Sequence, residues 1–281
     1  MAHPFLDHLV ILLPHSTLLT PPSWLSSAFH LFPGGRHADG HTANTLVLLP
    51  DGTYLELIAF LPHVTPDSRV QHRWGREREG RFVDYALSIA AGTGPSSSPE
   101  DRFAPVRARV AAGSKSLTYS DPSAGGRTQD DGTDIRWAIS FASSEDTGKA
   151  PTPGELPFWC LDRTPRPLRV PYAEPGNVRH PSGAKGIAAV DVTVASEEAR
   201  EVYGFIQGVE GRDAGDGKKV WDLAVPEGPA SELRVGVDAG VAEGKEKIRL
   251  TILTERGTEP KTIGGDVGEG VELWIDLKPE A

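Results

Sequence analysis

The sequence predicts an α+β fold in which short strands dominate and one strand–helix–strand unit recurs along the chain. The 281 residues include 31 glycines and 24 prolines, which favours many short elements joined by tight turns over long helices. Short apolar runs bounded by Gly, Pro or Asp are typical of strands. The recurring order predicts a core built from similar units, although some such orders arise by chance in any α+β protein of this size.

The first unit begins with the apolar run at residues 6–13, which is expected to form a buried strand ended by Pro14. Ser23 can cap a short helix, which the glycine pair at residues 34–35 then ends. Residues 45–49 and 53–60 are predicted strands joined by a Pro-Asp-Gly turn, so they form a hairpin.

The same pattern restarts in the middle of the chain. Residues 82–89 read as a strand, residues 98–112 as a helix and residues 121–134 as a flexible turn rich in glycine. Predicted strands at 135–142 and 156–162 complete this second unit.

A third unit follows a proline-rich crossing segment. A strand is predicted at residues 187–195 and a helix at 197–208, capped by Ser196. Further strands are expected near residues 219–225, 233–237, 247–254 and 271–277. We therefore predict paired modules at 1–165, a crossing segment at 166–186 and a C-terminal module at 187–281.

Composition narrows the cellular context and the class of partner. The single cysteine, Cys160, excludes an internal disulfide, and the N-terminal apolar run is broken by Asp7 and His8, unlike a signal peptide. No stretch approaches the roughly 20 apolar residues needed to cross a bilayer. The net charge of −10 argues against nucleic acid or an anionic membrane as the main partner. We expect a cytoplasmic protein that binds a small molecule, and a homodimer is left open.

Five short motifs carry a family resemblance. They are LDHLV at residues 6–10, GGRHADG at 34–40, TAN at 42–44, GTYLEL at 52–57 and HPSGA at 180–184. In this order and spacing, over residues 5–186, the chain resembles the glyoxalase-like domain family of the vicinal oxygen chelate superfamily. The resemblance implies paired βαβββ modules whose mixed sheets curve into a cup, here with a further C-terminal module.

The resemblance also implies a site for a divalent ion, because metal-dependent members bind one with the first and last strands of each module. The matching positions in the first module are His8 and Glu56. Strand alternation independently places each of them on an apolar face, where a lone carboxylate must be neutralised, paired or bound to a metal. A metal site, a metal-free acid–base or ligand site, and a purely structural pair all stay open.

The other units match the ligand pattern poorly. Tyr85 and Cys160 align with the two ligand positions in the second unit, and Val192 and Glu272 align with them in the third. The candidate metal ligands are therefore His8, Glu56 and Glu272. Such an incomplete set suits either a solvent-open divalent ion of unknown identity or no cofactor at all.

Residues 34–44 form the second candidate for chemistry. Their glycines allow close backbone approach, and His37 and Asn44 offer polar groups that can orient a ligand, although a turn that bonds only to itself would look the same. Tyr54, which shares the face of Glu56, and His180, in the later motif, are further ligand-binding candidates.

Two functions follow from this pattern. The first is a glyoxalase-like enzyme with lyase or isomerase chemistry on a small oxygenated metabolite, in which His8, Glu56 and His37 are catalytic. The second is a binding protein that sequesters a small molecule in the same cup without catalysis. The fold alone does not choose between them.

Overall fold

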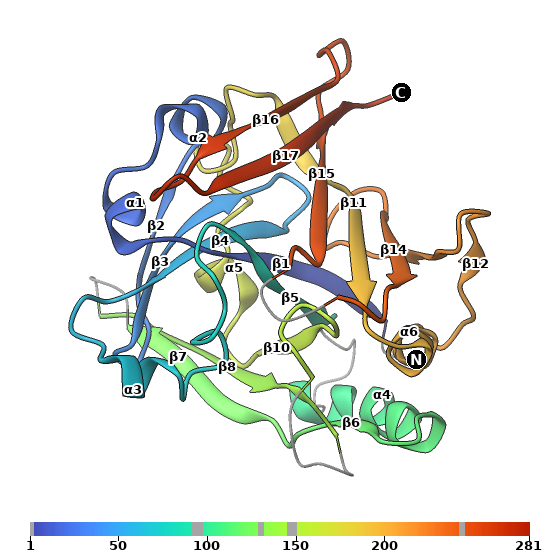
Figure 1. Ribbon diagram of the computed structural model, residues 1–281. Helices are drawn as coiled ribbons and strands as arrows, with labels where there is room; N and C mark the ends of the chain where they lie inside the picture. Colours follow the sequence, from blue (N-terminus) through green and yellow to red (C-terminus); the bar gives the residue numbers. More distant parts are fainter. Residues whose placement is uncertain (1–2, 91–97, 129–131, 145–150, 242–244) are drawn as a thin grey trace.

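The computed structural model describes residues 3–90, 98–128, 132–144, 151–241 and 245–281, and two large mixed sheets dominate it (Figure 1). The first sheet has the strand order β2-β3-β4-β1-β5-β10-β8-β7, and the second has the order β12-β13-β14-β11-β15-β17-β16. A two-stranded sheet joins β6 (Leu117–Tyr119) to β9 (Ala142–Ser144). No helix in the described part of the chain is long and apolar enough to cross a membrane.

The first sheet holds two βαβββ units. The first unit contains β1 (Pro4–Leu12), α1 (His15–Leu19), α2 (Ser23–Ala28), β2 (Phe32–Arg36), β3 (Thr42–Leu48) and β4 (Tyr54–Phe60). After the short α3 (Pro66–Arg69), the second contains β5 (Arg81–Ile89), α4 (Pro99–Gly113), β7 (Ser123–Thr128), β8 (Asp134–Ser140) and β10 (Phe158–Asp162). The antiparallel pair β1 and β5 lies at the centre, and each of these strands runs parallel to the last strand of its own unit.

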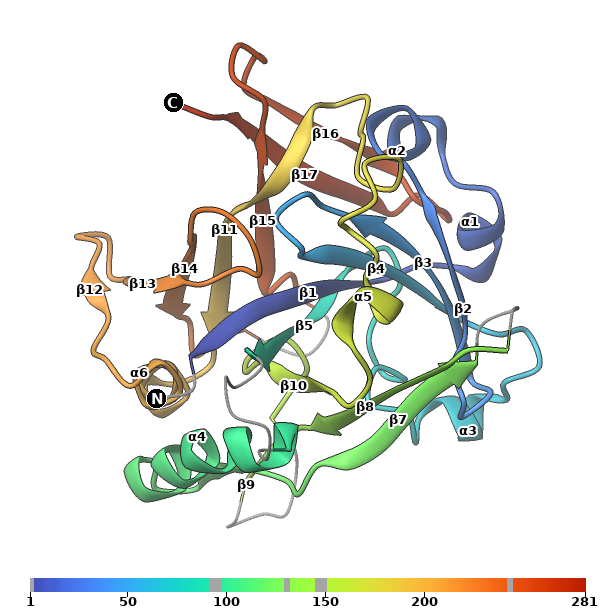
Figure 2. The same ribbon diagram turned by 180° about the vertical axis from the view of Figure 1, so that it is seen from behind.

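This sheet curves strongly, so that its two edge strands, β2 and β7, come close together in both views (Figures 1 and 2). The predicted α+β fold, with repeated modules that form a curved mixed-sheet cup, is confirmed. The short helix α5 (Arg166–Arg169) follows β10 and leads toward the second sheet.

The second sheet has the same central arrangement of strands as the first. Its members are β11 (Ala184–Val194), α6 (Glu197–Gln207), β12 (Arg212–Asp213), β13 (Lys219–Leu223), β14 (Ser231–Val237), β15 (Ile248–Thr254), β16 (Lys261–Asp266) and β17 (Glu272–Pro279). Strands β11 and β15 are antiparallel, while β14 and β17 run parallel to them on either side. The C-terminal part thus contains one βαβββ unit followed by three more strands, β15, β16 and β17.

A single apolar core joins the two sheets. It contains residues of β1 and β5, of the helices α4 and α6, and of β11 and β15. At its centre the hydroxyls of Tyr85 and Tyr203 are hydrogen-bonded, and Tyr203 Oη also donates to the Glu155 carbonyl at 2.5 Å. The domain boundaries proposed from the sequence stay a prediction.

Local expectations were met at two helices and missed elsewhere. Ser196 caps α6, as its position before an apolar periodic segment indicated, and Ser98 caps α4 through a capping box. Ser23 is not a cap, because α2 begins at Ser23 with Pro22 before it. The predicted turn at residues 121–134 contains β7, whose residues pair with β8; its residues 129–131 lie outside the described residues.

Candidate active site

A cavity of about 380 Å³ lies against one face of the first sheet. Its walls are mainly aromatic and apolar, and the large side chains among them include Trp74, Trp137, Phe141 and Phe158. Polar groups enter from β1, β4 and the turn after β2, and these include His8, Glu56 and His37. A largely apolar hollow with a few convergent polar groups is typical of a small-molecule site.

His8 is held firmly in this wall. It is 2% exposed, its ring stacks on Tyr54 with centroids 4.5 Å apart, and Phe158 meets it edge-on. Its Nδ1 lies 3.0 Å from Asp7 Oδ2, so the carboxylate fixes the orientation of the ring. Its Nε2 has no hydrogen-bond partner within the described chain and lies 3.6 Å from Glu56 Oε2. The predicted proximity of His8 and Glu56 is thus confirmed.

Glu56 lies one parallel strand away, because β1 and β4 pair in a register that sets Val10 beside Glu56. Asn44 Nδ2 donates to Glu56 Oε1 at 2.6 Å, and His37 Nε2 lies 3.4 Å from the same oxygen. Burial alone would raise the pKa of Glu56, but the hydrogen bond and charge of His37, with His8 and Asn44, lower it to about 2. Glu56 is therefore an ionised carboxylate between two imidazoles.

His37 and Asn44 lie on a β-hairpin and not in an irregular loop, because most of residues 34–44 belong to β2 and β3. His37 lines the cavity, and its Nδ1 lies 2.7 Å from Thr42 Oγ1. Asn44 accepts a hydrogen bond from the Gly35 backbone and positions Glu56, so it acts behind the cavity wall. A Cβ at Gly34 would lie 2.0 Å from Asn44 Oδ1, which explains the glycine.

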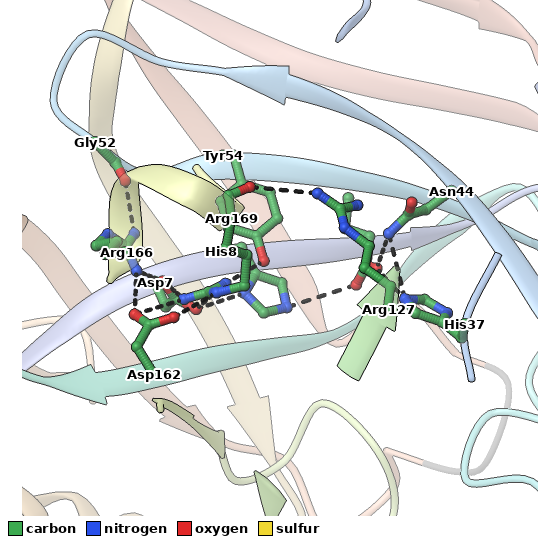
Figure 3. Close-up of polar contacts among 11 residues, drawn as sticks. Asp7, His8, His37, Asn44, Gly52, Tyr54, Arg127, Asp162, Arg166 and Arg169 are labelled. Atoms are coloured by element: carbon green, nitrogen blue, oxygen red, sulfur yellow. Dashed lines mark hydrogen bonds and ion pairs between the residues drawn. The ribbon is translucent and has the colours of Figure 1, made fainter. Parts of the chain in front are cut away.

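A buried cluster of charges supports His8 from behind (Figure 3). Arg169 Nη1 donates to Asp7 Oδ2 at 3.0 Å and to Tyr54 Oη at 2.7 Å, and its Nε donates to Asp162 Oδ1 at 2.6 Å. Arg166 also pairs with Asp7. Burial would raise the pKa of Asp7, but these two arginines hold it well below its usual range. No sequence pattern indicated this cluster, since Arg166 and Arg169 lie far from Asp7 along the chain.

Two predicted site residues are not brought to the cavity. His180 is buried elsewhere: its Nδ1 accepts from the His30 backbone N–H at 3.1 Å, and its Nε2 lies 2.8 Å from the Leu48 carbonyl. Both ring nitrogens are therefore used within the protein, and burial lowers the pKa of His180. Glu272 is exposed at the start of β17 in the second sheet. The structure therefore does not bring His180 or Glu272 together with His8 and Glu56, and their predicted roles stay predictions.

The second unit does not complete a metal site. Tyr85 points to the opposite face of the sheet and bonds Tyr203, while Ala86 pairs with His8. Cys160 does line the cavity, but burial raises the pKa of its thiol well above its usual value, which disfavours the thiolate that ligates metals. The described residues contain no cluster of three His, Cys, Asp or Glu that could hold a metal ion. This donor set does not fit a divalent ion.

The sequence matches the glyoxalase-like domain family over residues 6–204, which is more than half of the chain. The chain therefore belongs to this family, and its paired βαβββ units agree with the vicinal oxygen chelate superfamily that the motifs indicated. No curated protein matches the sequence.

Solved structures share the fold at low sequence identity. A hypothetical protein from Staphylococcus aureus is 14% identical with a TM-score of 0.66, covering 99% of this chain and 100% of its own. The 2,2',3-trihydroxybiphenyl 1,2-dioxygenase from Sphingomonas wittichii is 9% identical with a TM-score of 0.43 (98% and 91% covered). A variant of glyoxalase I from Zea mays is 12% identical with a TM-score of 0.30 (98% and 92% covered). The first likeness shows the fold alone, and the other two are too weak to bear on function.

Proposed function

We propose that this protein is a glyoxalase-like enzyme that moves a proton at a carbon next to a carbonyl group of a small oxygenated metabolite, in a lyase or isomerase type of reaction. The observation that carries the proposal is the state of His8. It is a buried imidazole whose Nδ1 is fixed by Asp7 and whose Nε2 has no hydrogen-bond partner within the described chain.

In this proposal His8 Nε2 takes the proton from the substrate carbon, and the electrons of the broken C–H bond move onto the carbonyl oxygen. Asp7 stays ionised and holds the Nδ1 proton, so the Nε2 lone pair is available to the substrate. The stacked Tyr54 and the edge of Phe158 keep the ring in one orientation, which lowers the cost of reaching the reactive geometry.

Glu56 and His37 complete the proton path. The fixed negative charge of Glu56, 3.6 Å from His8 Nε2, stabilises the imidazolium that forms when His8 accepts the proton. With its pKa near 2, Glu56 is itself a poor base. His37 has a 19% exposed side chain, so it can exchange protons with solvent and deliver one to the substrate oxygen or to the neighbouring carbon.

The test is the exchange of substrate C–H protons for deuterium. Hydroxyacetone, phenylacetone and phenylpyruvate are incubated with the protein in D₂O, and loss of the proton signal next to the carbonyl is followed by NMR. We expect exchange above the buffer rate for at least one probe and a loss of about 100-fold in His8→Gln. His30→Gln, the same change at an exposed histidine, should leave the rate unchanged.

Thermal unfolding of both variants checks that each is folded. If wild-type protein exchanges none of the three probes above buffer, or if His8→Gln exchanges as fast as wild type, the proposal is wrong. The apolar walls of the cavity would then favour the second candidate function, sequestration of an aromatic small molecule, which quenching of Trp74 and Trp137 fluorescence by the same probes would detect.

A further inference from the structure

Three arginines line the cavity within the described residues, and two of them are neutralised by acids. Arg73 Nε lies 2.6 Å from Asp84 Oδ2. Arg169 is bound by Asp7 and Asp162. The positive charges of Arg73 and Arg169 are therefore neutralised by ion pairs within the protein.

The third arginine, Arg127 on β7, is different. It is 8% exposed, forms no ion pair with any described residue, and its Nε has no hydrogen-bond partner. Within the described residues its side chain donates one hydrogen bond, from Nη2 to the Arg169 carbonyl at 3.4 Å, drawn as a dashed line in Figure 3. A buried cation with so few partners is costly, and burial indeed lowers the pKa of Arg127. A ligand group from outside the chain would complete the contacts of Arg127.

We propose that Arg127 binds the carboxylate of the substrate, so that the substrate is a monocarboxylic acid with a flat apolar body. This inference deepens the proposed function and rests on it, because a substrate exists only if the protein is an enzyme. A guanidinium offers parallel N–H donors that match the two oxygens of a carboxylate. The Nε of Arg127, which has no hydrogen-bond partner among the described residues, is one of the donors that such a bidentate contact uses.

Charge balance selects a monoanion. Arg127 is the only cavity-lining arginine of the described chain without an acid partner, and the ionised Glu56 lines the same cavity. A carboxylate brings one negative charge to one unpaired cation. A phosphate dianion would bring a second negative charge that no remaining arginine neutralises, close to Glu56.

The cavity walls select the body of the ligand. Trp74, Trp137 and Phe158 are each at most 8% exposed and present aromatic surface to the same space as Arg127. Trp137 lies so close over Gly125 that a Cβ there would come within 2.4 Å of its Nε1. The neighbouring strand β8 therefore places the flat indole of Trp137 over Gly125, two residues from Arg127 on β7, which suits an aromatic ring or a similarly flat group.

The test compares two probes that differ in one group. Phenylpyruvate and phenylacetone share the benzyl ketone, but only phenylpyruvate carries a carboxylate. Binding is measured by tryptophan fluorescence and calorimetry. We expect phenylpyruvate to bind about 10-fold or more tightly than phenylacetone, and Arg127→Met to abolish that preference while leaving phenylacetone binding unchanged. Arg127→Lys should retain part of the preference, since it keeps the charge but not the fork.

Arg249→Met removes the same charge from the exposed face of the second sheet, where the side chain is 78% exposed, and should leave both affinities unchanged. Because Arg127 holds no acid in place, Arg127→Met should also melt at or above the wild-type temperature. Equal affinity for both probes in wild-type protein, or a preference that survives in Arg127→Met, would overturn the inference. Carboxylate binding through Arg127 without deuterium exchange would overturn only the proposed function. Deuterium exchange of phenylpyruvate that is equally fast in wild type and in Arg127→Met would overturn only the carboxylate site.

Discussion

The two sheets share one central design and use it differently. In each, an antiparallel pair is flanked by two parallel strands, β4 and β10 in the first sheet and β14 and β17 in the second. The first sheet encloses a cavity and buries its charged groups, among them Asp7, Glu56 and Arg169. The second keeps charged pairs such as Asp191 with Lys218 at its surface, and Trp274 is 49% exposed.

The completeness of its units distinguishes the sheet that encloses the cavity from the second sheet. Both units of the first sheet have their full set of strands, and the edge strands β2 and β7 come close together (Figures 1 and 2). The last unit of the second sheet runs from β15 to β17 with three strands and no helix in its described part. Burial in the first sheet makes each polar group expensive, so those that persist there have a stabilising or chemical role.

The largest loss of stability is expected from a substitution that breaks the buried charge cluster. Arg169→Met leaves Asp7 and Asp162 without their main partner and should lower the free energy of unfolding by about 3–5 kcal/mol. Lys218→Met, which breaks a pair at the surface of the second sheet, should change it by less than about 0.5 kcal/mol. Urea unfolding of both variants measures the contrast. Equal losses would show that burial does not distinguish the two sheets.

Acid should weaken the protein through Glu56. Its folded-state pKa of about 2 lies below the ordinary value of 4.5, so its contribution to stability is complete above about pH 4.5 and is lost as the pH falls toward 2. The full contribution is about 3 kcal/mol, of which about 2 kcal/mol is lost by pH 3. Glu56→Gln lacks this pH-dependent contribution. The difference in the free energy of unfolding between wild type and variant should therefore change by about 2 kcal/mol between pH 6 and pH 3. A constant gap in urea unfolding would contradict the low pKa.

The sequence anticipated the pairing of His8 with Glu56 because both residues interrupt apolar alternation on strands that the motifs place side by side. It misplaced Tyr85 because pairing of β1 with β5 contains register shifts between Leu6 and His8 and between Val10 and Ile11. Such an irregularity changes which residues face each other across the strands, and no local pattern in the sequence announces it.

Arg127 escaped prediction for a related reason. Its segment contains Gly125 and Gly126, which indicate a turn, yet it forms a strand because β8 pairs with it along its whole length. The pairing of Arg169 with Asp7 likewise depends on contacts between segments 162 residues apart. Long-range contacts of this kind decide the charge balance of the cavity, and local propensity carries no information on them.

Asp51 joins the two sheets and offers a smaller test of the comparison. Its Oδ2 accepts from the Ile187 backbone N–H at 2.8 Å, and its Oδ1 accepts from Thr53. Asp51→Asn replaces an acceptor with a donor and should cost about 1–3 kcal/mol at pH 5. Burial raises the pKa of Asp51 to about 6, so the wild type loses stability as the pH rises from about 4 to 6, and the gap to the variant should narrow at pH 7.5. If urea unfolding shows that the difference in free energy of unfolding grows as the pH rises, the pKa of Asp51 is shifted in the opposite direction.

The smallest expected effect is that of a chelator. His8 and Glu56 alone offer a divalent ion one nitrogen and a carboxylate whose Oε1 is already bound by Asn44, and the second unit supplies Ala86 and a protonated Cys160 instead of ligands. Zinc or manganese added to the purified protein should therefore be lost on dialysis, and EDTA should leave the melting temperature within about 1 °C, since little binding energy is linked to folding. The second sheet should also retain no added ion on dialysis, because Glu272 is exposed at the start of β17. Metal analysis and thermal unfolding with and without EDTA measure both points. A stoichiometric ion that survives dialysis in wild type but not in His8→Ala, and whose removal lowers the melting temperature, would show that the buried polar groups of the first sheet are organised around a metal and not around proton transfer.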